Sequence, residues 1–138
     1  MMYDERFIAP MRAELTRIGV TELKTPAEVD GALKDAPGTT LLVVNSMCGC
    51  AARNARPAIT LALANAKKPA KLTTVFAGQD AEATERARSY IAGYRPSSPS
   101  IALLKDGKVA FMLERNQIEG RDAASIAADL TAAFDANC

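Results

Sequence analysis

The sequence contains no histidine among its 138 residues. This absence excludes a Ser-His-Asp triad, a Cys-His nucleophile pair, a His-ligated zinc ion and a haem with a proximal histidine. A charge excess is missing too, since 17 Lys and Arg residues stand against 16 Asp and Glu residues and the formal net charge is +1. We therefore expect no nucleic-acid partner and no anionic membrane partner. The chemistry has to come from Cys, Lys, Tyr or carboxylate side chains.

Long hydrophobic runs are also absent. The longest strongly apolar run is Leu41–Val44, far short of the about 20 residues of a transmembrane helix. Residues 1–6 are charged and no apolar stretch follows them, so we expect no secretory signal. The three cysteines, an odd number, speak against a disulfide framework and predict free thiols in a reducing, cytoplasmic setting. A chain of this length buries roughly two thirds of its unfolded surface, which predicts one domain over residues 1–138.

The spacing of apolar residues predicts a mixed α/β chain. Apolar stripes at three- and four-residue steps predict helices over Phe7 to Ile18, Val29 to Ala36, Ala52 to Ala66, Ala83 to Ile91 and Asp122 to Cys138. Runs rich in β-branched and apolar residues predict strands over Thr39 to Asn45, Lys71 to Ala77, Ile101 to Leu104 and Val109 to Leu113.

Caps, prolines and turns refine this prediction. The segment Thr25–Glu28 predicts a capping box, and Asp106-Gly107 predicts a β-hairpin. We expect Pro10 to kink or delay the first helix, and Pro57 to bend the third. The order of elements predicts a central mixed sheet, with a parallel βαβ half and an antiparallel hairpin, flanked by helices and preceded by an extra N-terminal helix.

Two cysteines, Cys48 and Cys50, lie at the junction between a predicted buried strand and a helix. The positive end of the helix stabilises a thiolate, so Cys48 is the expected nucleophile and Cys50 the expected resolving thiol. Gly49 permits the strained backbone that a disulfide across one residue needs, which predicts a comparatively oxidising couple. Arg53 and Arg56 either add positive potential or simply face solvent.

Other roles for the cysteines remain open at this point. Cys48 and Cys50 are alternatively two small core residues, or thiolates of a Cu(I) or Zn(II) site with Cys138 as a third ligand. A further alternative is that the protein is a non-catalytic interaction module in which the cysteines have no chemical role. Cys138 continues the apolar stripe of the last helix but ends the chain, and we assign it no catalytic role.

Pro99 leads directly into a predicted strand after two serines. A trans peptide bond would only mark the strand edge. A cis bond at Ser98-Pro99 would bring an exposed backbone edge toward the cysteines, where main-chain hydrogen bonds can hold a disulfide-bearing chain. The sequence does not select between the two isomers.

The strand, cysteine pair, helix with a proline, proline-led strand, hairpin and closing helix together resemble the thioredoxin fold. Several segments more specifically resemble the bacilliredoxins of the A/B type: Pro10–Leu15, Val43–Ala52, Ala55–Ala58, Thr74–Asp80, Ser97–Ser100 and Ile118–Gly120. The resemblance spans nearly the whole chain. The sequence departs from the standard thioredoxin motif, because no Trp precedes the pair and one residue separates the cysteines instead of two.

This resemblance implies a cytoplasmic enzyme that removes bacillithiol, or a similar low-molecular-weight thiol, from S-thiolated proteins. Cys48 matches the family's nucleophile and Cys50 its resolving position, and Pro99 matches the cis-proline position. Gly49, Ser98 and Pro99 are then the expected substrate-binding residues. The family needs no metal and no cofactor beyond bacillithiol as co-substrate. It also implies disulfide isomerase-like activity as an alternative.

Overall fold

The computed structural model describes residues 3–138. The helices and strands are α1 (Glu5–Thr16), β1 (Thr21–Glu22), α2 (Pro26–Leu33), β2 (Thr39–Asn45), α3 (Arg56–Ala62), β3 (Lys71–Phe76), α4 (Ala81–Arg88), β4 (Ser100–Lys105), β5 (Lys108–Leu113) and α5 (Ala123–Asn137). A π-helical turn covers Ala51–Ala55, and 3-10 turns cover Ser89–Ile91 and Arg115–Gln117.

The five strands form one mixed sheet in the order β1-β3-β2-β4-β5. The central strand β2 is parallel to β3 and antiparallel to β4, and β4 is antiparallel to β5. All seven residues of β2 are buried, as its continuous apolar run predicts. The expected α/β architecture, with a parallel half and a hairpin, is confirmed.

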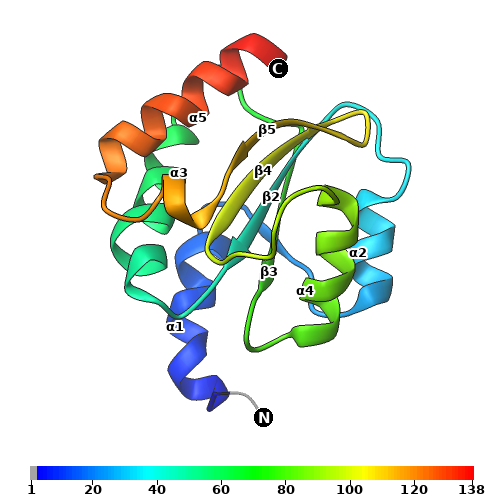
Figure 1. Cartoon of the computed structure of the whole chain (residues 1–138), viewed down its shortest axis with the longest axis vertical. Coiled ribbons are helices and arrows are strands. Elements are labelled where there is room, and N and C mark those ends of the chain that lie inside the picture. Colours follow the sequence, from blue (N-terminus) through cyan, green and yellow to red (C-terminus); the bar gives the residue numbers. More distant parts are fainter. Residues whose placement is uncertain (1–2) are drawn as a thin grey trace.

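Helices cover both faces of the sheet (Figure 1). Because side chains alternate along a strand, Leu41 and Val43 of β2 face the core under α3 and α5, whereas Leu42 and Val44 face the core under α2 and α4. Each half of the core therefore depends on the same strand, and β2 is fixed in register from both sides. This strand carries the cysteine segment at its carboxyl end.

Local sequence signals set several element ends as predicted. Thr25 and Glu28 form the complete capping box of α2, and the Asp122 side chain accepts a hydrogen bond from the backbone N–H of Ser125 at the start of α5. Asp106 and Gly107 both have positive φ angles, 50° and 82°, in the turn of the β4–β5 hairpin.

Four features differ from the sequence prediction. The edge strand β1 was not predicted, because two residues are too few for a recognisable alternation. Phe7 is 52% exposed instead of buried, since the first turns of α1 project beyond the sheet (Figure 1). Pro10 lies inside α1 and does not delay its start at Glu5. The helix after the cysteines ends at Ala62, and Pro57 is the second residue of α3, after the π-helical turn and Arg56.

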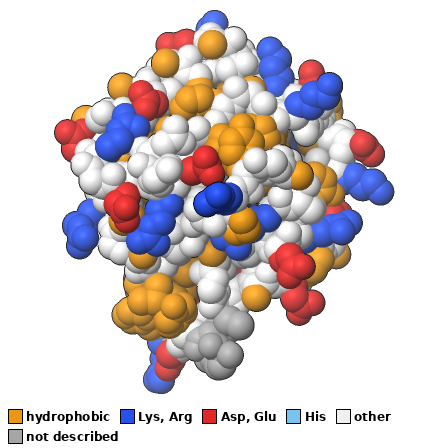
Figure 2. Space-filling model, in the orientation of Figure 1, with side chains coloured by type: hydrophobic (Ala, Val, Ile, Leu, Met, Phe, Trp, Pro, Cys, Tyr) orange, Lys and Arg blue, Asp and Glu red, His pale blue; other side chains and the backbone are white. Residues whose placement is uncertain are grey.

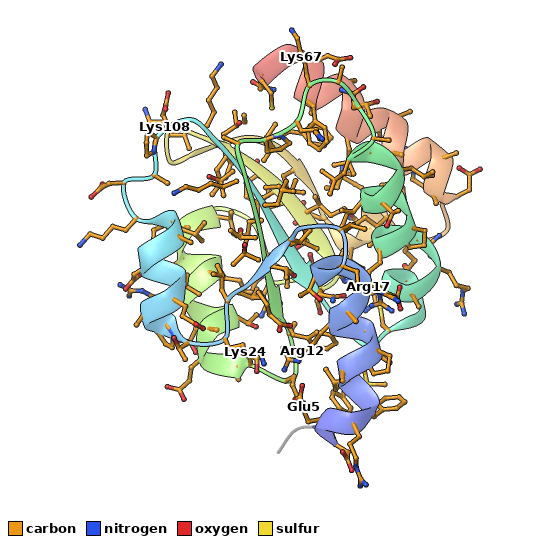
Figure 3. All side chains as sticks on the ribbon, turned by 180° about the vertical axis from the view of Figure 1, so that it is seen from behind. Glu5, Arg12, Arg17, Lys24, Lys67 and Lys108 are labelled. Atoms are coloured by element: carbon orange, nitrogen blue, oxygen red, sulfur yellow. The ribbon has the colours of Figure 1, made fainter. Side chains whose placement is uncertain are left out.

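The helix α1 is tied to the sheet by Arg12, which is only 7% exposed. Its guanidinium donates hydrogen bonds to Glu5, Glu22 and Asp80, with the shortest distances 2.6 to 2.7 Å, and lies 5.4 Å from the centre of the Phe76 ring. Figure 3 shows Arg12 between α1 and the sheet, with Glu5 nearby. Asp80 occupies the N-cap position of α4 but makes no side-chain cap there, because its carboxylate faces Arg12.

The surface carries positive and negative side chains interspersed on the face drawn in Figure 2, and hydrophobic side chains gather over the projecting part of α1. This mixture agrees with the near-zero net charge. Within residues 3–138, none of the helices has the length and apolar character required to cross a bilayer.

Candidate active site

The two cysteines lie where the central strand gives way to a helix. β2 ends at Asn45, and helical structure begins at Gly49. Cys48 precedes this helix, its carbonyl oxygen accepts hydrogen bonds from the N–H groups of Ala51 and Ala52, and Cys50 lies in the first turn. Both thiols are free and half-buried, so neither is sealed in the core. The reading of the pair as two small core residues is therefore wrong.

Several groups act on the Cys48 sulfur. Burial opposes its ionisation, but hydrogen bonds from the Ser46 hydroxyl and from the backbone N–H groups of Ala51 and Cys50, together with the charge of Arg115, outweigh it and lower the pKa of Cys48. The backbone donors are N–H groups of the first helical turn. The helix N-terminus therefore stabilises the Cys48 thiolate, as the sequence predicts.

The pKa of Cys50 moves in the opposite direction. Burial raises it first, and the negative charge of Cys48 and a hydrogen bond to the Cys48 sulfur raise it further. Arg115 lowers the pKa of Cys50, whereas Glu119 raises it. The Cys50 Sγ lies 3.7 Å from Glu119 Oε2, within the range of a thiol hydrogen bond to a carboxylate. In the reduced site, Cys48 is therefore the more readily ionised of the two thiols.

Arg115 connects the cysteines to the proline loop before β4. Its side chain donates hydrogen bonds to the backbone oxygen of Ser98 at 3.2 Å and to Glu119 Oε2 at 3.3 Å, while its backbone N–H donates to the Ser97 hydroxyl at 3.3 Å. The charge of Cys48 in turn raises the pKa of Arg115. The Ser98-Pro99 peptide bond is cis, which selects between the two isomers that the sequence leaves open.

A buried ionic network holds the segment before Cys48. Arg56, only 2% exposed, donates hydrogen bonds to Glu14, to Asn45 Oδ1 at 3.0 Å and to the backbone oxygen of Ser46 at 2.9 Å. The π-helical turn before α3 directs Arg56 inward. Of the two alternatives left open for Arg56, the solvent-facing one is wrong, and its hydrogen bonds hold the carboxyl end of β2.

Gly49 separates the two cysteines and lies beneath the guanidinium of Arg53. A Cβ placed on Gly49 would lie 2.6 Å from the Nη2 atom of Arg53, so the missing side chain leaves room for this arginine. Gly49 has no positive φ angle in this reduced form. Arg53 itself is exposed, and the cation that lowers the pKa values of both thiols is Arg115.

Cys138 lies at the end of α5, exposed to solvent, and Figure 1 places the C-terminus on the far side of the molecule from α1. Among residues 3–138, His, Cys, Asp and Glu side chains form no group of three or more that is placed to hold a metal ion. The described residues therefore do not form the three-thiolate site considered from the sequence.

Sequence reasoning missed Arg115, Glu119 and Ser46. Ser46 precedes Cys48 by two residues, and a short polar side chain just before a helix start is a recognisable signal of a hydrogen-bonding group at that position. Arg115 and Glu119 lie 65 to 71 residues after the cysteines, and no periodic pattern indicates them. The only sequence signal near Glu119 is the resemblance of Ile118–Gly120 to the bacilliredoxins, which assigns no role to this carboxylate.

Comparison with known proteins gives the family. The family model described as disulphide isomerase matches residues 3–138. A bacilliredoxin of Koribacter versatilis is 54% identical over 99% of this chain and 94% of its own length, and one of Bacillus licheniformis is 50% identical over 99% of this chain and 95% of its own length. A bacilliredoxin of Salinibacter ruber is 55% identical and covers this whole chain and 82% of its own length.

The fold has a counterpart among solved structures. The crystal structure of oxidised thioredoxin O2 from Arabidopsis thaliana superposes with a TM-score of 0.55 at 18% identity, covering 86% of this chain and 96% of that one. The resemblance to thioredoxin noted from the sequence is thus confirmed at the level of the fold. The chain belongs to the bacilliredoxin family, whose members are thiol-disulfide oxidoreductases of thioredoxin-like fold.

Proposed function

We propose that the protein removes a low-molecular-weight thiol of the bacillithiol type from protein mixed disulfides. Cys48 attacks the sulfur of the small thiol, the target protein leaves as a thiol, and the small thiol stays on Cys48 as a mixed disulfide. Cys50 then attacks Cys48 and releases the small thiol. The observation that carries this proposal is the opposite shift of the two thiol pKa values at one helix start.

The charges of the site support this order of events. While Cys48 is a thiolate, its charge and its hydrogen bond keep the Cys50 proton in place. Once Cys48 carries the small thiol, that charge is gone, and Arg115 acts on Cys50 without competition from it. The resolving thiol is thus held back until the first step is complete.

Substrate contacts follow from the same geometry. The backbone edge at Ser98 and Pro99 is the proposed holding place for the disulfide-bearing chain, and Gly49, which lies beneath the Arg53 guanidinium, is the third proposed contact. Bacillithiol serves as co-substrate in this scheme, and no metal or organic cofactor takes part.

The test is a protein carrying a bacillithiol mixed disulfide, mixed with the reduced enzyme and followed by intact mass. We expect the wild type to remove the adduct, Cys50→Ala to accumulate bacillithiol on Cys48, and Cys48→Ala to be inactive. Cys138→Ala is the matched control and should behave as the wild type. Removal of the adduct by Cys48→Ala at the wild-type rate would refute the assigned roles.

A second candidate function is disulfide isomerase-like activity, which the description of the matching family model favours. Its assay is the recovery of activity by a ribonuclease with scrambled disulfides. Isomerisation needs Cys48 alone, because the mixed disulfide is returned to the substrate. Recovery that persists in Cys50→Ala would support it.

A further inference from the structure

The Cys50 thiol must lose its proton before it attacks the mixed disulfide on Cys48, and the scheme above names no acceptor for it. A carboxylate oxygen, Glu119 Oε2, lies 3.7 Å from Cys50 Sγ and accepts a hydrogen bond from it. This carboxylate is exposed on the loop that follows the 3-10 turn after β5. The groups that act on Cys50 are Cys48, Arg115 and Glu119, and of these only Glu119 is a carboxylate.

The same oxygen is held in place from its other side. Arg115 Nε donates to Glu119 Oε2 at 3.3 Å, and another nitrogen of the same guanidinium donates to the Ser98 backbone oxygen. The carboxylate is therefore not a freely rotating surface group. It is oriented toward Cys50 by an arginine that is itself tied to the proline loop.

We propose that Glu119 is the proton acceptor for Cys50 in the step that resolves the mixed disulfide on Cys48. This inference rests on the proposed function, since it assumes that Cys50 resolves an adduct on Cys48. Glu119 would then be a catalytic residue, because it contacts a reacting atom.

In the resolving step, the Cys50 Sγ–H proton passes to the Glu119 carboxylate while the sulfur lone pair forms the Sγ–Sγ bond with Cys48. The bond between Cys48 and the small thiol breaks, and its electron pair leaves with the small thiol. The small thiol is thereby reduced, the two cysteines become a disulfide, and Glu119 passes its proton to the departing thiolate or to water.

Two readings of Glu119 make opposite predictions. If this carboxylate acted only through its charge, Glu119→Gln would remove a charge that raises the pKa of Cys50, and resolution would become faster at neutral pH. If it accepts the proton, the same substitution slows resolution. The sign of the effect therefore distinguishes a proton acceptor from a neighbouring charge.

The experiment uses the symmetrical disulfide of thionitrobenzoate as probe and the full chain in its reduced form, with Cys138→Ala in every variant, because the exposed Cys138 thiol would release thionitrobenzoate of its own. Attack by Cys48 releases one coloured thionitrobenzoate, and resolution by Cys50 releases the second, so stopped-flow absorbance separates the two steps. The first phase tests the proposed function and the second tests the role of Glu119. Glu114→Gln is the matched control, because Glu114 lies in the same segment and, among residues 3–138, has no hydrogen bond to either sulfur.

We expect Glu119→Gln to keep the first phase and to slow the second at least about 10-fold at neutral pH. The difference in second-phase rate between Glu119→Gln and the wild type should vanish at high pH, where Cys50 is already ionised. In Glu119→Asp, the rate of the second phase should lie between those of the wild type and Glu119→Gln, because the carboxylate is kept but its side chain is shorter. A second phase that is unchanged or faster in Glu119→Gln would overturn the proposal. In Cys48→Ala we expect only the slow direct reaction of Cys50, and a first phase at the wild-type rate there would instead overturn the proposed function.

Discussion

The buried charge network around Arg12 makes a quantitative prediction for stability. Replacing Arg12 with Met keeps an aliphatic side chain but leaves Glu22 and Asp80, each only 15% exposed, without their shared cation. Removing one partner of a buried ion pair costs about 3–5 kcal/mol. Both carboxylates keep some contact with water, and Lys24 lies 3.7 Å from Glu22, which favours the lower end of this range. We expect the free energy of unfolding to fall by about 3 kcal/mol.

Urea unfolding followed by circular dichroism measures this loss. With a denaturant dependence of about 1.5–2 kcal/mol per molar urea, the midpoint should fall by about 1.5–2 M. Arg17→Met is the matched control on the same helix (Figure 3). The Arg17 side chain is exposed and, among residues 3–138, donates only to the backbone oxygen of Ala13, so its replacement should change stability by less than about 0.5 kcal/mol. A loss below about 1 kcal/mol in Arg12→Met would refute the reasoning.

The same network predicts a pH dependence with a definite sign. The hydrogen bond from Arg12, supported by Gln79, holds the pKa of Glu5 below its usual value, so the folded state binds this proton less readily than the unfolded state. The stability from this pairing is present above the unfolded pKa of about 4.3 and is lost as the pH falls through the lower folded pKa. The difference in the free energy of unfolding between wild type and Arg12→Met should therefore become smaller as the pH falls below about 4.3.

Three further predictions concern the cysteines. Ser46→Ala removes a hydrogen bond that lowers the pKa of Cys48, so the pH midpoint of Cys48 alkylation, followed by mass spectrometry, should move upward; an unchanged midpoint would contradict the role of the hydroxyl. Gly49→Ala requires only that the flexible end of Arg53 move, so thermal unfolding should show a change between zero and about 1 kcal/mol of stabilisation, and a large loss would show that the glycine is needed in the reduced form. Cys138→Ser should leave the rate of adduct removal unchanged, because this residue is exposed at the chain end; a slower rate would assign it a part in turnover.

Those parts of the fold that depend on short-range rules were predictable from the sequence. The capping box at Thr25, the Asp106-Gly107 turn and the buried strand β2 each follow from a few adjacent residues. The placement of Cys48 at a helix start follows in the same way, because it needs only a strand, a turn and an apolar stripe in succession.

Other features depend on contacts between distant segments. Arg12 and Asp80 are 68 residues apart, and no local pattern reveals that one neutralises the other. The charged residue Arg56 interrupts an otherwise apolar stripe, and its partners Glu14 and Asn45 come from two other elements. Arg115 likewise reaches the site only because the hairpin returns the chain to the cysteines. Tertiary structure, which the sequence pattern does not encode locally, therefore decides the electrostatics of the site.

The opposite shifts of the two thiols also set the proton stoichiometry of the redox couple. Between the two pKa values, the reduced pair carries a single proton, so forming the disulfide releases two electrons but only one proton. The midpoint potential then changes by about 30 mV per pH unit in this interval, half the slope of a pair that begins with two protonated thiols. Acidification in this interval would consequently raise the midpoint potential of this couple less than that of an ordinary dithiol. The equilibrium of thiol-disulfide exchange between the two would therefore depend on pH.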